Sequence, residues 1–208
     1  MAKWCGARGP GTRKKPPRPA FADDLSESLQ EAFRLLADAV PNRRSPFHTP
    51  TIASLDDTGA PSLRTVVLRG FDAEARTLRF HTDRRSDKAR GIARDPRVMM
   101  HFYDAALHVQ MRVAGRASLH LDDALADAAW AGSQRSSRMC YAAPDASGAV
   151  VPAPPAAPQD TEIGRQHFAA VVIGFRRLEW LWLAAAGHQR ARFIWDEAGN
   201  LTADWIAP

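Results

Sequence analysis

The segment Ser62–Tyr103 constrains the fold most, because it alternates short apolar runs with polar connections. Ser62–Arg69 is rich in β-branched residues, and Thr77–Thr82 alternates apolar with polar side chains. Two such runs separated by a short polar link, here around Gly70, predict a β-hairpin.

The residues after the second predicted strand indicate a corner that can bind phosphate. Ser86 is a suitable N-cap for a helix that runs to about Arg94, and the first N–H groups of such a helix favour an anion. The side chains available there are the hydroxyls of Thr82 and Ser86 and the cations of Arg84, Arg85 and Lys88. A solvated basic turn is the alternative, and this segment alone does not separate the two.

The rest of the chain predicts further short strands with helices between them. We expect helices over Ala22–Val40, Asp122–Gly132 (with Asp122 as its cap) and Ser133–Ala142, and strands within Pro46–Leu55 and over Arg97–Tyr103, His108–Leu121, Phe168–Phe175, Leu178–Leu183, Arg190–Trp195 and Leu201–Ile206. Gly115 is expected to relieve a bend or bulge in the longest of these strands. About eight short strands without a βαβ alternation suit a closed antiparallel barrel.

Composition and charge narrow the class of protein. The net charge is +5, but residues 1–20 hold six of the 28 cations and no acid, which leaves 22 cations against 23 acids elsewhere. We predict a basic disordered tail over 1–20, a single domain over 21–208 and an exposed proline-rich loop over 144–158. No apolar run is long enough for a membrane span. Cys5 and Cys140 have no metal-binding spacing, and together these features favour the cytoplasm.

Several motifs in order resemble the pyridoxamine 5'-phosphate oxidase family of FMN-binding split barrels, and within it the oxidase-related branch. They are R-T-V-V-L-R from Arg64, F-H-T-D-x-x-S-x-K from Phe80, D-P-R-V from Asp95, V-Q-M-R-V-x-G from Val109, E-W-L-W-L-A-A-A-G-H-Q-R-A-R-F from Glu179, and the closing W-I-A-P. The resemblance covers 47–208. It implies an antiparallel split β-barrel with flanking helices, and a homodimer with FMN at the subunit interface.

The resemblance also assigns site residues. Those implied to bind FMN are Arg64, Thr65, Val66, Val67, His81, Thr82, Ser86, Lys88, Gln110, Gln134, Ser136, Trp182 and Arg192. Those implied to contact a small-molecule substrate are Arg69, His188 and Arg190. The residues alone, without the resemblance, predict other roles. Gln110 would be an edge-strand residue facing water, Trp182 would pack in the core, and Arg192 would form a surface ion pair. No catalytic residue is assigned, and no metal site is predicted.

Departures from the family pattern bear on the reaction. His81 stands where an aromatic residue is usual, and Asp87 where many members have a second cation. Arg69 replaces a lysine, and the final substrate-binding pair is inverted as His188 and Arg190. The resemblance therefore implies an FMN-dependent oxidoreductase but not oxidation of pyridoxamine 5'-phosphate. The alternatives are a non-catalytic flavin or haem carrier and, ranked last, a nucleic-acid-binding protein that uses the basic tail.

Overall fold

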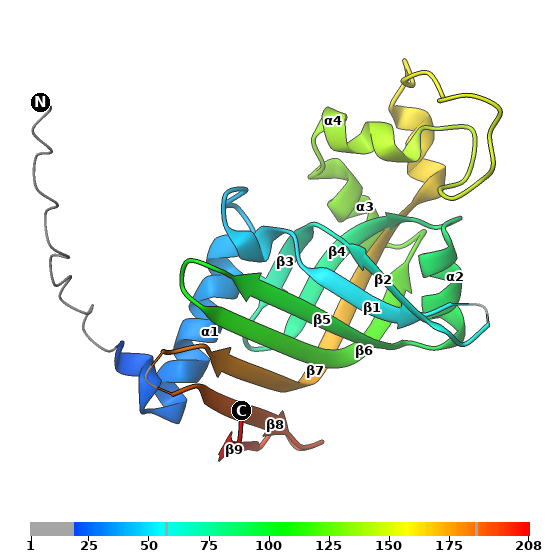
Figure 1. The fold of residues 1–208 in the computed structure, drawn as a ribbon. Coiled ribbons are helices and arrows are strands. Elements are labelled where there is room, and N and C mark those ends of the chain that lie inside the picture. The colour runs from blue at the N-terminus through cyan, green and yellow to red at the C-terminus, as the bar shows by residue number, and fades with distance from the viewer. Residues whose placement is uncertain (1–18, 57, 186) are drawn as a thin grey trace, which may run out of the picture.

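Nine strands form one antiparallel sheet that curls around an apolar core (Figure 1). The computed structural model describes residues 19–56, 58–185 and 187–208. The strands in these residues are β1 (Thr51–Leu55), β2 (Pro61–Thr65), β3 (Leu68–Asp72), β4 (Thr77–Asp83), β5 (Arg97–Asp104), β6 (Val109–His120), β7 (Phe168–Trp182), β8 (Gln189–Trp195) and β9 (Leu201–Ile206).

Helices lie against this sheet and beyond one end of it (Figure 1). The α-helices are α1 (Leu25–Ala39), α2 (Asp87–Arg94), α3 (Ala124–Ala131) and α4 (Arg135–Arg138). Short 3-10 turns precede or connect them: η1 (Ala20–Ala22), η2 (Pro46–His48), η3 (Met139–Tyr141) and η4 (Glu162–His167). No helix among the described residues is long and apolar enough to cross a membrane.

The sheet is an open barrel. Its strands follow the order β2-β1-β5-β6-β7-β4-β3, and β8 pairs with β7 and β9. The two end strands, β2 and β3, do not pair with each other in the described part of the chain. The antiparallel split barrel is therefore confirmed, and the expectation of a closed barrel is wrong.

The predicted strand Ser62–Arg69 is two strands. Val66 and Val67 lie between β2 and β3, and the Val66 N–H donates to the Pro50 carbonyl oxygen at 2.9 Å. The break separates the chain so that β2 pairs with β1 and β3 pairs with β4. The hairpin turn accordingly falls at 73–76, and not at Gly70. Val66 and Val67 do not indicate this break in the sequence, because valine favours strands.

Helix α1 lies across the barrel between β3 and β8. It begins after Asp24, whose carboxylate accepts a hydrogen bond from the Glu27 N–H at 2.9 Å. Phe33 on its apolar face packs edge-on against Phe71 of β3 and stacks on Trp195 of β8. The helix thereby joins two strands that do not pair with each other.

The pairing register assigns each strand residue to one of two faces, because directly opposed residues share a face. One row of successive partners is fully buried and marks the core face: Ile52, Met100, Val113, Leu178 and Phe193. The adjacent row is polar and marks the outer face: Thr51, His101, Arg112, Glu179 and Arg192. These two faces decide which candidate site residues can meet.

A lobe of α3, α4 and the loop 144–158 projects from one end of the barrel (Figure 1). Its own small core places Trp130 and Tyr141 edge-on against Phe168, at 5.3 and 5.1 Å between ring centroids. The cap of α3 is Asp123, which accepts from the Ala126 N–H, so the expected cap at Asp122 was one residue early. The proline-rich loop has no helix or strand, as predicted.

The predicted tail can be compared with the structure only at its end. Residues 1–18 lie outside the described residues, and Ala20 already begins η1. The predicted tail over residues 1–20 therefore stays a prediction.

A β-bulge at Gly115 bends the longest strand pair. The register between β6 and β7 shifts between Ala114 and Gly115, which confirms the expected irregularity. A Cβ on Gly115 would lie 2.5 Å from the Gly174 carbonyl oxygen and 2.8 Å from Ile173 Cγ2. The close approach of the two backbones leaves no room for a side chain.

We predict that Gly115→Ala destabilises the protein by about 1–3 kcal/mol, because a methyl group there must push β6 from β7. Gly174→Ala is the matched control, since a Cβ on Gly174 meets no atom within 4 Å. Urea unfolding followed by circular dichroism measures both. Equal stabilities of the two variants would contradict the steric argument.

Candidate functional site

The end of β4 and the start of α2 form a buried polar corner. Ser86 caps α2 as predicted: its hydroxyl accepts from the Ala89 N–H at 3.3 Å and donates to the Asp83 carbonyl oxygen at 2.7 Å. The Thr82 hydroxyl lies 3.3 Å from that of Ser86, and both side chains are buried. The corner therefore combines two hydroxyls with the N-terminus of an eight-residue helix.

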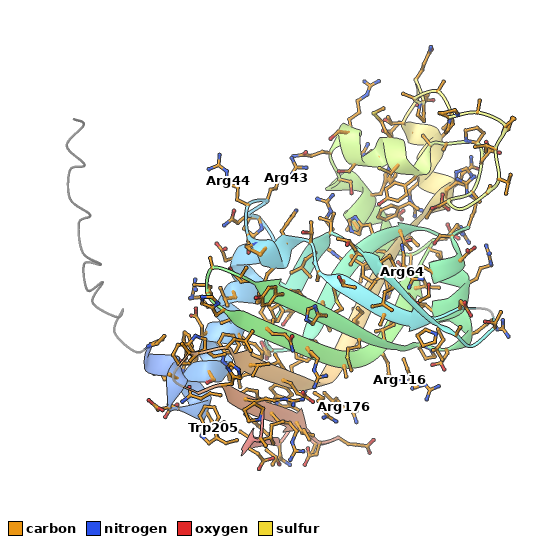
Figure 2. The ribbon with its side chains drawn as sticks, in the orientation of Figure 1. Arg43, Arg44, Arg64, Arg116, Arg176 and Trp205 are labelled. Atoms are coloured by element: carbon orange, nitrogen blue, oxygen red, sulfur yellow. The ribbon has the colours of Figure 1, made fainter. Side chains whose placement is uncertain are left out.

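Two cations meet at this corner. The Lys88 ammonium lies over the Phe80 ring, 5.8 Å from its centroid. Burial, and then the positive charge of Arg64, lower the pKa of Lys88 to about 8. Burial also lowers the pKa of Arg64. Figure 2 shows Arg64 over the sheet on the side of α2. An anion between these two groups would favour the charged form of both.

Serine side chains of β1 and β2 hold the Arg64 guanidinium. It donates to the Ser54 hydroxyl at 2.6 Å, to the Ser62 hydroxyl at 2.5 Å and to the Ser62 carbonyl oxygen at 3.0 Å. Arg64 lies opposite the core residue Ile52 in the β1–β2 ladder, so its side chain points to the core face of the sheet. Neutral acceptors orient the guanidinium without cancelling its charge.

Arg84 and Arg85, the other two cations predicted at this corner, form ion pairs within the fold. Arg84 pairs with Asp122 at 3.1 Å. Arg85 pairs with Asp83 at 2.7 Å and donates to the carbonyl oxygens of Ala143 and Pro144. Among the described carboxylates, none forms an ion pair with Lys88. Lys88 therefore remains the cation of this segment that is able to bind a ligand.

The backbone segment Thr65–Val67 links β2 to β3 beside this corner. Thr65 is exposed, Val66 is buried and Val67 is half-buried. Since the Val66 N–H is bound to the Pro50 carbonyl oxygen, it is not available to a ligand in this conformation.

A second group of predicted residues lies on the outer face of the sheet. Gln110 is opposed to Leu181, which is opposed to Arg190. Arg192 lies in the next outward-facing row and pairs with Asp204 at 2.8 Å. Gln110, Arg190 and Arg192 are therefore neighbours on one surface.

A buried carboxylate organises this surface. Glu179 accepts hydrogen bonds from Arg112, from Arg177 at 2.5 Å and from Arg190 at 2.6 Å. Although burial raises the pKa of Glu179, the hydrogen bonds from Arg190, Arg112 and Arg177 outweigh it and hold the pKa at about 2. Three guanidinium groups on one carboxylate leave a surplus of positive charge on this face.

Trp182 does not share this surface. It is opposed to the fully buried Val109, and its ring meets the edge of Phe21 at 5.7 Å between centroids. It packs against the main core. This position fits the core-packing alternative, and Leu181 stands in the outward-facing place beside Gln110.

The two groups lie far apart within one chain. Thr82 of the corner is opposed to Ala169 at one end of β7, whereas Gln110 is opposed to Leu181 at the other. These β7 residues are twelve positions apart, or about 40 Å at the rise of a β-strand. One small ligand cannot touch both groups in a single protomer.

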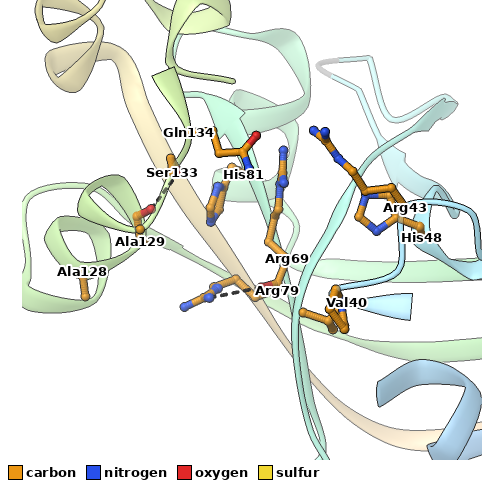
Figure 3. A pocket seen from close by; sticks show the side chains of 12 residues that line it. Val40, Arg43, His48, Arg69, Arg79, His81, Ala128, Ala129, Ser133 and Gln134 are labelled. Carbon is orange, nitrogen blue, oxygen red and sulfur yellow. Dashed lines mark hydrogen bonds between the residues drawn. The ribbon is translucent and has the colours of Figure 1, made fainter. Parts of the chain in front are cut away.

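A third group lines a basic pocket between β3–β4, the end of α1 and the α3–α4 connection. Arg69, His81 and Gln134 of the predicted set lie here together with Arg43, His48 and Arg79 (Figure 3). The cavity has a volume of about 300 Å³. Arg69 sits in a bulge of β3, where the register with β4 shifts.

Ser136 and His188 are solvent-exposed, as are Thr65 and Gln134. Ser136 lies on α4, and its neighbour Ser137 accepts a hydrogen bond from Arg69 at 3.2 Å. His188 lies beside Arg190 in a shallow hollow that Trp205 also lines. The described residues include no group of three or more histidine, cysteine, aspartate or glutamate side chains placed to hold a metal ion.

The sequence arguments missed residues that the fold brings to these groups. Arg79 precedes His81 by two positions and Arg112 follows Gln110 by two, so strand alternation would have placed each beside its partner. Arg43 follows α1 in a connection, and no local pattern predicted its position.

We predict that Lys88 makes the ligand-free protein more stable as the pH rises from 8 to 10.5. The folded pKa of about 8 lies below the ordinary 10.5, so in this window the unfolded chain binds more protons. Lys88→Met should lose this rise and be more stable below pH 8, by at most roughly 3 kcal/mol. Urea unfolding at pH 7 and 10 measures the difference, and Arg116→Met at an exposed site is the control. A rise that persists in Lys88→Met would assign it to another group.

Comparison with known proteins agrees with this fold. Residues 27–121 match the family model described as pyridoxamine 5'-phosphate oxidase, FMN-binding domain. A pyridoxine/pyridoxamine 5'-phosphate oxidase of Anaeromyxobacter dehalogenans is 37% identical over 121 residues, 58% of each chain. That of Alkalilimnicola ehrlichii is 37% identical over 89 residues, 43% of this chain and 44% of the relative. The chain thus matches about half the length of these relatives.

Solved structures share the fold at low sequence identity. An FMN-binding, pyridoxamine 5'-phosphate oxidase-related protein from Nostoc punctiforme has a TM-score of 0.68 and 21% identity, covering 86% of this chain and 97% of its own. PhzG from Burkholderia lata, in complex with tetrahydrophenazine-1-carboxylic acid, has a TM-score of 0.70 and 19% identity, covering 92% and 97%. Residues 27–121 of this chain are therefore similar to the FMN-binding domain of the pyridoxamine 5'-phosphate oxidase family, and the fold is that of the split-barrel proteins.

Proposed function

We propose that this protein is a homodimeric oxidoreductase that binds FMN and acts on a small molecule. The observation that carries the proposal is the pair of cations at the β4–α2 corner. Arg64 and Lys88 lie close enough to lower the pKa of Lys88, without a carboxylate bound to either. Two like charges that are close together and partly buried lower the free energy of unfolding, and an anion bound between them would offset this loss.

The corner suits a phosphate monoester. The Lys88 ammonium and the Arg64 guanidinium supply charge, the hydroxyls of Thr82 and Ser86 supply hydrogen bonds, and the start of α2 adds the positive end of a helix dipole. The phosphate of FMN would therefore be held by Arg64, Thr82, Ser86 and Lys88.

The rest of the cofactor site would come from a second copy of the chain. Thr82 of the corner is opposed to Ala169 of β7, whereas Gln110 and Arg192 on the outer face are opposed to Leu181 and Glu179, about 40 and 33 Å farther along that strand. One flavin reaches both groups only across two protomers. The Gln110 amide offers a donor and an acceptor to the polar edge of the flavin ring. Arg192 and the surplus charge around Glu179 would favour the negative charge that a flavin gains on reduction.

Bound FMN would supply the redox chemistry, as a hydride acceptor for a small donor. The chain's own residues bind and orient. Arg69 in the basic pocket, with His188 and Arg190 on the partner's surface, would contact the substrate. Arg190 is fixed for this task by its hydrogen bond to Glu179 at 2.6 Å.

We predict that the purified protein is yellow, with one FMN per protomer. Arg64→Ala and Lys88→Ala should each weaken FMN binding about 10- to 100-fold, because each removes a charge-assisted hydrogen bond to the phosphate. Arg116→Ala removes the same charge from an exposed site on β6 and should change the affinity less than twofold. Titration of FMN fluorescence measures the affinities. A wild-type protein that takes up no FMN would refute the proposed function.

We also predict complementation between protomers. Lys88→Ala and Gln110→Ala should each weaken both sites of their own homodimers. In a mixed dimer one site carries both defects and the other carries none, so one FMN per dimer should bind with wild-type affinity. Dissociation, mixing and re-association under mild urea, followed by FMN titration, tests this. If both residues acted from the same chain, no wild-type site would appear.

A further inference from the structure

A serine, a histidine and an aspartate form a chain of hydrogen bonds where β6 ends and α3 begins. Ser118 and His120 lie two positions apart on β6, so their side chains share one face, and Asp123 is the N-cap of α3. The Ser118 hydroxyl lies 3.1 Å from His120 Nε2, and His120 Nδ1 lies 2.8 Å from Asp123 Oδ2. A nucleophile, a base and a carboxylate that orients the base are connected in this order in serine hydrolases.

The carboxylate decides which nitrogen of His120 carries the proton. An ionised aspartate can only accept a hydrogen bond, so Nδ1–H of His120 donates to Asp123. In the neutral ring Nε2 is then an acceptor, and it faces the Ser118 hydroxyl. The Val172 carbonyl oxygen also lies within reach of this hydroxyl, but at the longer distance of 3.3 Å. His120 is therefore placed to take the Ser118 proton.

The two oxygens of Asp123 have separate tasks. Oδ1 accepts a hydrogen bond from the Ala126 N–H at 2.9 Å and caps α3, whereas Oδ2 accepts from His120. The hydrogen bond from Ala126, and then that from His120, lower the pKa of Asp123, so its carboxylate is ionised at neutral pH. The helix cap thus holds the carboxylate in one orientation toward the imidazole.

The Ser118 hydroxyl is open to a substrate. Ser118 is exposed, and 26% of the His120 side chain is accessible to solvent. The first residue of β5, Arg97, lies opposite Arg116, so β6 extends past the neighbouring strand at Ser118. A small molecule can therefore approach Ser118 without displacing any part of the sheet.

The backbone next to Ser118 offers a donor for a carbonyl oxygen. The Ala117 N–H donates to the Pro96 carbonyl oxygen on the β5 side of β6 at 2.8 Å. Because N–H groups alternate in direction along a strand, the Leu119 N–H points to the same side, past the start of β5. An N–H directly after a nucleophilic serine is a common donor to the oxyanion that forms during acyl transfer.

This group of residues is separate from the proposed flavin site. Gln110 lies eight positions before Ser118 on β6, or about 26 Å away. The Arg64 side chain points to the core face of the sheet, whereas Ser118 is exposed. Arg79 of the basic pocket is opposed to Val172, which is opposed to Ser118, so two strand spacings of about 10 Å in total separate them.

We propose that Ser118, His120 and Asp123 form a second active site, which hydrolyses small carboxylic esters that have a good leaving group. Ser118 Oγ would bond to the acyl carbon while its proton passes to His120 Nε2. The ester C–O bond then breaks, and His120 returns the proton to the departing oxygen. A water molecule next gives a proton to His120 and attacks the acyl-serine, which releases the carboxylic acid and restores the Ser118 hydroxyl. The reaction needs no redox cofactor, so it goes beyond the proposed function and does not depend on it.

The test is hydrolysis of p-nitrophenyl acetate by the full chain. We expect a burst of p-nitrophenol of up to one per chain, and an acetyl group on Ser118 that mass spectrometry of peptides detects. Ser118→Ala and His120→Gln should each lower kcat/KM at least about 20-fold. Ser26→Ala and His108→Asn change exposed residues elsewhere and should keep kcat/KM within about twofold of the wild type. Hydrolysis by His120 alone would leave Ser118→Ala fully active, and this outcome would overturn the proposal.

Asp123→Asn separates the positioning role of Asp123 from its role as a cap. Asparagine caps a helix about as well as aspartate does, so the melting temperature should stay within about 2 °C of the wild type. The charge that orients and stabilises His120 is lost, so kcat should fall at least about tenfold while KM is unchanged. Asp123→Glu, which keeps the charge, should recover part of the rate. A kcat that is unchanged in Asp123→Asn would exclude this positioning role.

The same assay with and without added FMN distinguishes this proposal from the flavin function. The rate of ester hydrolysis should be equal in both, and Lys88→Ala should hydrolyse the ester as the wild type does. A protein that takes up no FMN but acetylates Ser118 would refute the flavin function alone. Absence of acetyl-Ser118, or equal rates in the wild type, Ser118→Ala and His120→Gln, would overturn the hydrolase site whether or not FMN binds.

Discussion

Strand β7 decides where each candidate side chain can act. It pairs with β4 along its first half, with β8 along its second half, and with β6 along most of its length. These ladders fix His81 opposite Ala170 and Arg190 opposite Leu181. Because a register slip of one residue would move every side chain to the other face, the hydrophobic core holds this spacing. The proposed flavin site draws on both ends of β7 and would therefore be shared between two chains.

At the β4–α2 corner, charge pairing separates the structural cations from those that are able to bind a ligand. Arg85 is bound to Asp83 and to carbonyl oxygens of the loop 144–158, so it fastens the loop to the barrel. Lys88 and Arg79 lack a carboxylate partner, although both are held partly away from water. Leaving them so costs stability that a neutral side chain would avoid. That cost is explained if each cation meets an anionic ligand.

The sequence predicted most elements because their signals are local. Alternation found β4 and β6, and Ser86 marked the start of α2. The break at Val66 was not predictable in this way, because it depends on a hydrogen bond to the distant Pro50. The same holds for the candidate site. The sequence motifs predicted Arg64, Lys88 and Gln110, but the position of Arg43 and Arg79 beside Arg69 depends on tertiary packing. The face of Trp182 follows from strand register, which the motif alone did not fix.

Asp87, an acid in the first turn of α2, would repel a phosphate bound at the β4–α2 corner. Asp87 is stabilised there by the helix dipole, and it pairs with Arg90 one turn later. Its carboxylate is largely exposed, so solvent and salt screen its field. It raises the pKa of Arg64, yet burial outweighs this effect, and the pKa of Arg64 is lowered. The acid therefore weakens the attraction for phosphate only slightly, and the buried cation pair retains control of the corner.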